Sequence, residues 1–160
     1  MSDAALSLRH ALATLAYRAS KSLRGATPAF ADFRASETSR TPVEILAHMG
    51  DLMDWGLAMS RGTPKWNTSA PLPWDREVER FFAAVTAWDG YLAGPEPLGY
   101  EVERLFQGPI ADALNHTGQI NFLRRLAGEP VKGESYNRAA IAAGQTTFEQ
   151  PRPEAKYEFD

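Results

Sequence analysis

The sequence contains no cysteine among its 160 residues. Disulfide bonds, thiolate metal ligands and a cysteine nucleophile are therefore excluded, and this composition fits a reducing compartment. No apolar run approaches the roughly 20 residues that a helix needs to span a bilayer. The first ten residues also lack the basic and apolar regions of a signal peptide. We therefore expect a cytoplasmic protein that makes no membrane contact.

The sequence also lacks a strong excess of either charge. It has 17 Lys and Arg residues and 20 Asp and Glu residues, which gives a formal net charge of −3. Acidic and basic residues are mixed along the chain, so the basic surface typical of a nucleic-acid-binding protein is not expected. A glycine-rich phosphate loop, a dinucleotide fingerprint and a Ser-His-Asp order are also absent. The expected partner is a small-molecule substrate.

The sequence does contain strong helical periodicity. Four stretches repeat apolar residues at three- and four-residue steps, as amphipathic helices do; they cover residues 3–24, 41–62, 74–94 and 108–128. Residues 98–107 are interpreted as a short linking helix, Pro109 as a first-turn proline and Gly128 as the C-terminal cap of the last helix. Because no convincing strand is found, the pattern predicts an all-α fold, a four-helix bundle.

The length suits a single helical domain, which we place at residues 1–135. A C-terminal extension, residues 136–160, is expected to pack on the bundle or to trail from it. Within it, residues 137–143 are predicted to form one or two helical turns, and the last 15 residues an extended or frayed tail. The connection between the first two helices is long enough to permit an order other than simple up-and-down.

A pair of residues in the last helix has the spacing of metal ligands. Asp112 and His116 are four residues apart, so their side chains leave the same face of the helix, roughly 6 Å apart at Cβ. A carboxylate and an imidazole so placed can hold a divalent metal if a third ligand comes from elsewhere. His48, on an otherwise apolar face of the second helix, is the candidate. Spacing alone leaves open a core histidine and a surface pair instead.

Three segments carry a resemblance to a known family: TPVEILAHMGDLMDWGL, FFAAVTAWDGYL and GPIADALNHTGQINFLRRLAGEPV. The chain is similar over roughly residues 5–130 to the DinB/YfiT-like superfamily of four-helix bundles. In that family three histidines usually bind a metal, one on the second helix and two spaced four apart on the last. By position, His48 and His116 correspond to the first and last of these ligands. Asp112 replaces the middle histidine, and Thr117 replaces a frequent arginine.

The resemblance therefore implies a metal-dependent protein with an altered ligand set. Two imidazoles and one carboxylate resemble the triads of nickel, zinc and non-haem iron proteins, so the expected cofactor is a divalent transition metal: Ni, Zn, Fe or Mn. Three protein ligands leave coordination positions open, as catalytic sites do. We also expect a homodimer, because many bundles of this type pair through exposed helix faces.

Residues near the three ligands are candidates for supporting roles. Gln119, three residues after His116, is placed to orient that ligand or to bind substrate, although a packing or capping role is an equal alternative. Glu44, four residues before His48, is a weaker candidate for a general base, because a capping box already explains it. Trp55 lies at core spacing on the same side as His48 and is a second candidate for substrate contact.

Other conspicuous residues have simpler interpretations. Trp66, in the loop of residues 63–73, is predicted either to wall the mouth of a pocket or to pack on the C-terminal tail. Asp51 and Asp54 are predicted to lie on a solvated face, and His10 at the surface or an edge of the first helix.

Three hypotheses for function follow from these features. The first is a hydrolase-type enzyme, in which a metal-activated water attacks an ester- or amide-like substrate. The second is a metal-assisted thiol transferase or isomerase that uses a low-molecular-weight thiol, consistent with a chain that has no cysteine of its own. The third is a non-catalytic bundle that binds a metal or another ligand.

Overall fold

The computed structural model describes residues 2–160, and within this range the chain is mostly helical with little strand, so the predicted all-α class is confirmed. Four long helical segments account for most of it: α1 (Asp3–Leu23), α2 (Pro42–Ser60), α3 (Trp74–Ala93), and a last segment made of α4 (Val102–Leu105), the π-helical η2 (Phe106–Ile110) and α5 (Ala111–Leu126). The shorter elements are the 3₁₀ turns η1 (Pro28–Asp32), η3 (Tyr136–Arg138) and η4 (Ala155–Tyr157), and the strands β1 (Gly133–Glu134) and β2 (Glu158–Phe159).

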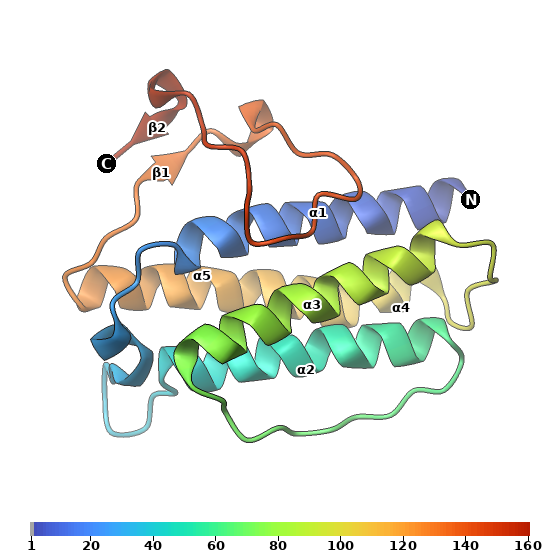
Figure 1. The fold of residues 1–160 in the computed structure, drawn as a ribbon, viewed down its shortest axis with the longest axis horizontal. Coiled ribbons are helices and arrows are strands. Elements are labelled where there is room, and N and C mark those ends of the chain that lie inside the picture. The colour runs from blue at the N-terminus through green and yellow to red at the C-terminus, as the bar shows by residue number, and fades with distance from the viewer. Residues whose placement is uncertain (1) are drawn as a thin grey trace.

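The four long segments lie side by side around one core (Figure 1). Both α1 and α2 pack against α3 and α5. The helices α2 and α3 run in the same direction, because residues 61–73 return along the length of the molecule between them, whereas α1 and α5 run the opposite way (Figure 1). The order is therefore not simple up-and-down, and the long return lies after α2 rather than after α1.

The capping box predicted at the start of α2 is confirmed. The Thr41 hydroxyl accepts a hydrogen bond from the Glu44 backbone N–H at 3.3 Å, and the Glu44 carboxylate accepts one from the Thr41 N–H at 2.7 Å. These two contacts satisfy N–H groups that a helix start leaves without intrahelical partners. They set the register of α2 and, with it, the face from which His48 projects.

The last helix departs from its prediction at its start. We expected it to begin at residue 108 with Pro109 in the first turn, and this is wrong: helix begins at Val102, and Pro109 lies inside the π-helical turn. Proline has no N–H to donate, so it interrupts the regular ladder. The wider turn absorbs this break, because the Ala111 N–H reaches the carbonyl of Phe106, five residues earlier. At the other end Gly128, with φ +77°, follows the last turn as predicted.

The core is built from side chains of all four long segments. Trp88 of α3 is fully buried, and its indole N–H donates to the Ser60 hydroxyl at 2.8 Å. Gly56 of α2 makes room for this ring, because a Cβ at that position would lie 2.3 Å from it. The other large apolar side chains with full burial are Phe30, Phe81, Leu12, Leu15, Leu46, Met49, Met53, Leu105, Ile110 and Ile120.

The C-terminal extension packs on α1 rather than fraying. Tyr17 of α1 donates to the buried Glu134 carboxylate at 2.7 Å, and the Lys21 ammonium lies 2.9 Å from Glu134 and 2.8 Å from Glu158. These contacts hold the antiparallel pair of β1 and β2 against the helix, two short strands that the sequence did not indicate. Of the helical turns expected at residues 137–143, only the single turn η3 at Tyr136–Arg138 forms.

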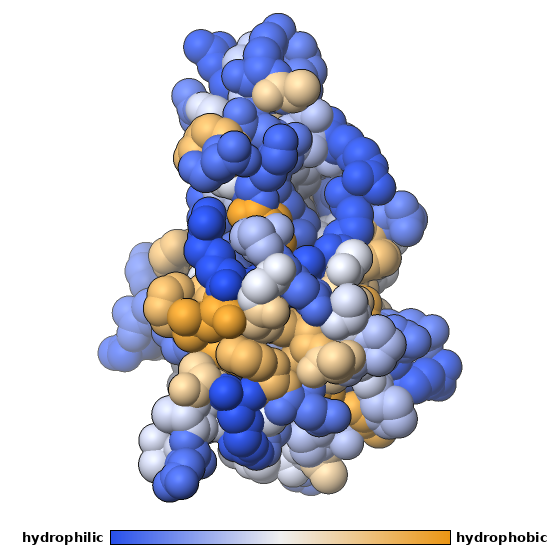
Figure 2. Space-filling view, turned by 90° about the vertical axis from the view of Figure 1, so that its left-hand side faces the viewer, coloured by the Kyte–Doolittle hydropathy of each residue, from blue (hydrophilic) through white to orange (hydrophobic). Residues whose placement is uncertain are grey.

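The two parts of the molecule present different surfaces. In Figure 2 the C-terminal extension, at the top, is largely hydrophilic, whereas apolar residues gather across the helical part below it. Among residues 2–160, no helix combines the length and the apolar character needed to cross a membrane.

Candidate metal centre

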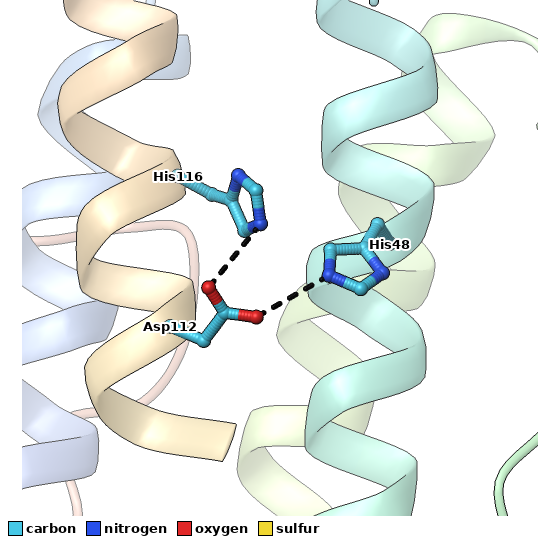
Figure 3. A group of neighbouring side chains, drawn as sticks. All are labelled: His48, Asp112 and His116. Carbon is cyan, nitrogen blue, oxygen red and sulfur yellow. Dashed lines mark hydrogen bonds and ion pairs between the residues drawn. The ribbon is translucent and has the colours of Figure 1, made fainter. Parts of the chain in front are cut away.

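The three residues predicted as metal ligands come together between α2 and α5 (Figure 3). His48 projects from α2 and faces Asp112 and His116 on α5. The Asp112 carboxylate lies between the two imidazoles, with one oxygen 3.4 Å from Nε2 of His48 and the other 3.4 Å from Nε2 of His116. The two rings lie edge to face, 4.8 Å apart at their centres.

The donor atoms fit a single ion. One ligand atom from each residue lies within 4.8 Å of the other two. Ligand atoms around a tetrahedral ion lie roughly 3.4 Å apart when each bond is about 2.1 Å. The Asp112 carboxylate lies at this separation from each imidazole, through a different oxygen for each, so these residues could hold one divalent metal ion. Two neutral imidazoles and a carboxylate are donors that suit a transition metal.

The site is closed on one side and open on the other. The exposed fraction of the side chain rises from 11% at His116 to 23% at His48 and 43% at Asp112. An ion held by these three groups would therefore keep coordination positions on the side of Asp112, where small molecules have access. This arrangement is typical of catalytic rather than structural metal sites, whose protein ligands enclose the ion.

Gln119 orients one of the imidazoles. Its side-chain oxygen lies 2.8 Å from Nδ1 of His116. An amide oxygen only accepts hydrogen bonds, so Nδ1 carries the proton and Nε2 presents its lone pair toward Asp112. A hydrogen-bond partner on the second ring nitrogen is the usual support of a metal-binding histidine. Of the alternatives open for Gln119, orientation of a ligand is therefore the one that the contact favours.

The surroundings of His48 favour its neutral form. Burial lowers the pKa of the imidazole below its usual value, and the positive charge of Arg40 and the neighbouring His116 act in the same direction. The carboxylate of Asp112 opposes them, but the net shift is downward. Metal ions bind the neutral imidazole, so this shift prepares the ligand.

Trp66 covers the site from the loop of residues 61–73. Its ring lies against His48, 5.5 Å between centres, and against Trp55, 5.7 Å between centres. Trp66 thus lies beside a candidate ligand, and its role as the wall of a pocket mouth stays a prediction. Trp55 is half-buried and packs near the π-helical turn, where a Cβ at Gly108 would lie 3.5 Å from its ring. It thus connects Trp66 to the turn that precedes Asp112.

Asp51 corrects a prediction, because it is buried and not on a solvated face. Its carboxylate accepts hydrogen bonds from the Arg80 guanidinium at 3.1 Å and from the Ser69 backbone N–H at 2.9 Å. Arg80 also donates to the buried Glu77 at 2.6 Å. This network ties the loop that carries Trp66 to α2 and α3. Asp54 is largely exposed, in agreement with the prediction.

Glu44 is occupied by contacts of its own. One carboxylate oxygen accepts the Thr41 N–H of the capping box, and the other lies 3.3 Å from the Arg34 guanidinium. The hydrogen bond from Thr41, more than Arg34, lowers the pKa of the carboxyl group. These contacts account for its position, and a role as general base stays a prediction. His10 is exposed, as predicted.

Two hollows flank the ligand triad, and some of the residues that line them, among them Arg40, Asn115 and Phe122, were not singled out by sequence reasoning. His116 borders one hollow together with Arg40, Asn115 and Phe122. His48 borders the other, with Arg40 again in its wall. No periodicity or spacing marks these residues, because they approach the site from the loop before α2 and from the solvent side of α5.

Comparisons with protein-family models, curated proteins and solved structures found no match to this chain. The resemblance to the DinB/YfiT-like superfamily therefore stays a prediction.

Proposed function

We propose that this protein is a metal-dependent enzyme of hydrolase type, built as a four-helix bundle of DinB/YfiT-like type. One observation carries the proposal: His48, Asp112 and His116, from two neighbouring helices, bring one donor atom each within 4.8 Å of the others. The packing of α1 and α2 against both α3 and α5 supports the bundle. The open side at Asp112 supports catalysis over a purely structural role.

Each residue of the site has a distinct task in this proposal. His48, Asp112 and His116 would hold the ion, which when bound polarises a carbonyl group and lowers the pKa of water. Asp112 lies between the two imidazoles, with one oxygen toward each, so an ion there would meet all three donors. Gln119 holds the proton on Nδ1 of His116, and its contact prevents rotation of the ring. Trp66 limits the access of solvent to His48.

A second candidate, a metal-assisted thiol transferase, is favoured by the presence of two hollows. The hollow beside His116 has a volume of about 560 Å³ and the one beside His48 about 330 Å³. Both lie in the range of small-molecule sites, roughly 300–1,000 Å³. A thiol and its acceptor could then approach the triad from two neighbouring hollows, and the chain supplies no cysteine that would compete.

The proposal is tested first by elemental analysis of the purified protein, without chelator, beside His48→Ala and His116→Ala. His10→Ala is the matched control, because it removes an exposed histidine of α1. We expect near-stoichiometric metal in the wild type and the control and its loss in the two ligand variants, with unchanged circular dichroism. Metal that persists in both variants, or a wild type that binds none of Ni, Zn, Mn and Fe(II), would contradict the proposal.

Turnover then separates the remaining functions. Ester and amide substrates are assayed with and without an added low-molecular-weight thiol. Activity without thiol that is lost in His116→Ala supports the hydrolase, whereas strict dependence on the thiol supports the transferase. A protein that binds metal and shows neither activity is a non-catalytic metal-binding bundle.

A further inference from the structure

Arg40 stands between the two hollows that flank the triad. In one hollow, apolar atoms make up most of the wall; it is bordered by Ile45, Phe122 and Leu123, and also by Arg40, His116 and further polar residues. The other is bordered by Arg40, His48 and polar groups of the loops on either side. Because Arg40 belongs to both walls, a molecule in either hollow meets its guanidinium next to the candidate ligands.

The charge of Arg40 is not neutralised by the protein. Among residues 2–160, no carboxylate forms an ion pair with it, whereas its neighbour Arg34 donates to the Ser39 carbonyl at 2.6 Å and lies 3.3 Å from Glu44. The acidic residue Asp51, which borders the same hollow, is already bound to Arg80. Arg40 therefore has its donors available for a ligand.

This free charge acts on the site itself. Arg40 and His48 border the same hollow, so the guanidinium lies close to the triad. A guanidinium offers donors in a planar fork that matches the two oxygens of a carboxylate. A single cation balances a single negative charge. The second arginine of the hollow, Arg34, is already paired with Glu44, so no second cation is left for a doubly charged phosphate.

The hollow beside His116 offers an apolar surface to the uncharged part of a ligand. Phe122 is a large aromatic side chain, yet 62% of it is exposed, on the wall that it shares with Ile45 and Leu123. The end of the molecule that carries residues 33–41 shows apolar groups between hydrophilic ones (Figure 2). An apolar ligand would cover the exposed ring and gain the hydrophobic contribution of its burial.

We infer that the substrate of this site is a carboxylate with an apolar body: Arg40 binds the carboxylate, and the body lies against Ile45, Phe122 and Leu123. The inference rests on the proposed function, since it names the substrate class of the same site. With the two ends held in this way, the part of the substrate between them lies beside His116. Arg40 is thus a specificity-determining residue and not a metal ligand.

A matched pair of probes tests the inference: 4-phenylbutyrate and the neutral 4-phenylbutyramide, titrated by calorimetry or by NMR. We expect the wild type to bind the carboxylate on the order of tenfold more tightly than the amide, as a charge-assisted hydrogen bond implies. Arg40→Gln is expected to abolish the preference, and Arg40→Lys to keep part of it. Arg76→Gln, which removes an exposed arginine of α3 that borders neither hollow, is the control and should leave the preference unchanged.

Each titration is run on metal-loaded and on metal-free protein, because a carboxylate can also bind a metal directly. The preference must depend on Arg40 in both forms. The inference is overturned if the two probes bind with equal affinity, if the preference survives in Arg40→Gln, or if it is seen only with metal. If phenyl phosphate binds more tightly than 4-phenylbutyrate in an Arg40-dependent way, the substrate is not a carboxylate. A protein without metal contradicts the proposed function, yet the Arg40 preference can still be measured on it, so the two failures are distinguishable.

Discussion

The side-chain oxygen of Gln119 lies 2.8 Å from Nδ1 of His116, one helical turn away on the solvent side of the ring. Through this contact Gln119, which lies outside the triad, sets the direction of the lone pair on Nε2 of His116. Because Nδ1 donates, Nε2 faces Asp112 and His48 in the form that binds a metal. Gln119 is not one of the three candidate ligands, yet it sets the tautomer in which His116 can bind a metal.

We predict that Gln119→Ala weakens metal affinity by about 10–100-fold, the usual effect of losing such a partner. Gln119→Glu keeps an acceptor at the same position and should retain most of the affinity. The measurement is a competition titration against a chelating dye. Asn115→Ala, an exposed polar residue of the same helix, is the control. Equal affinity of Gln119→Ala and wild type would show that the hydrogen bond does not support the ligand.

Asp112 allows a test of the ligand set itself. We predict that Asp112→Ala releases the metal, because two imidazoles alone leave the ion without its third protein ligand. Asp112→His replaces one donor by another and should keep the metal bound. Metal content after dialysis measures both variants. Retention in Asp112→Ala, or loss in Asp112→His, would indicate that this position lies outside the coordination sphere.

The features that sequence reasoning found are those encoded within one helix. The Thr41–Glu44 capping box needs only neighbouring residues, and the four-residue spacing of Asp112 and His116 places both on one face wherever the helix packs. His48 was found because a lone imidazole on an apolar face must point inward. His48, Asp112 and His116 lie together because α2 and α5 are in contact.

The features that it missed depend on partners far along the chain. Asp51 meets Arg80, 29 residues away, only because α3 runs parallel to α2, and the order of the helices is not written in their periodicity. The start of the last helix was misplaced because the turn before Pro109 is too short to show a period. Arg40 carries no sequence signal at all, since the lack of an acidic partner becomes visible only in three dimensions.

Gly56 permits a test of the core on which the site rests. A Cβ at this position would lie 2.3 Å from the fully buried ring of Trp88, and the ring has no room to withdraw. We predict that Gly56→Ala destabilises the fold by about 1–3 kcal/mol, the cost of overpacking a core. Chemical denaturation monitored by circular dichroism measures the free energy of unfolding.

The matched control is Gly90→Ala in α3. No atom lies within 4 Å of the Cβ that it would add, and the position is exposed. In a helix, alanine is favoured over glycine by about 0.5–1 kcal/mol, so this variant should be more stable than the wild type. If the free energy of unfolding falls in Gly56→Ala and rises in Gly90→Ala, the loss of stability is due to the contact with Trp88. The same sign in both would contradict this packing argument.

The C-terminal extension gives a prediction that depends on pH. The hydrogen bond from Lys21, together with its charge, lowers the pKa of the Glu158 carboxyl group below its unfolded value of 4.5. A carboxyl group whose pKa is lower in the folded state contributes stability above the unfolded pKa and loses it as the pH falls through the folded pKa. Glu158 should therefore stabilise the fold at pH 7 and contribute little at pH 3.

We predict that Glu158→Gln lowers the thermal unfolding midpoint at pH 7 and that the difference from wild type shrinks toward pH 3. Differential scanning calorimetry at the two pH values provides the comparison. Glu154→Gln is the control, because its ion pair with Lys156 is more than 60% exposed on both sides and contributes little. A deficit of equal size at both pH values would mean that Glu158 acts through packing, and that its ion pair with Lys21 does not hold the extension on α1.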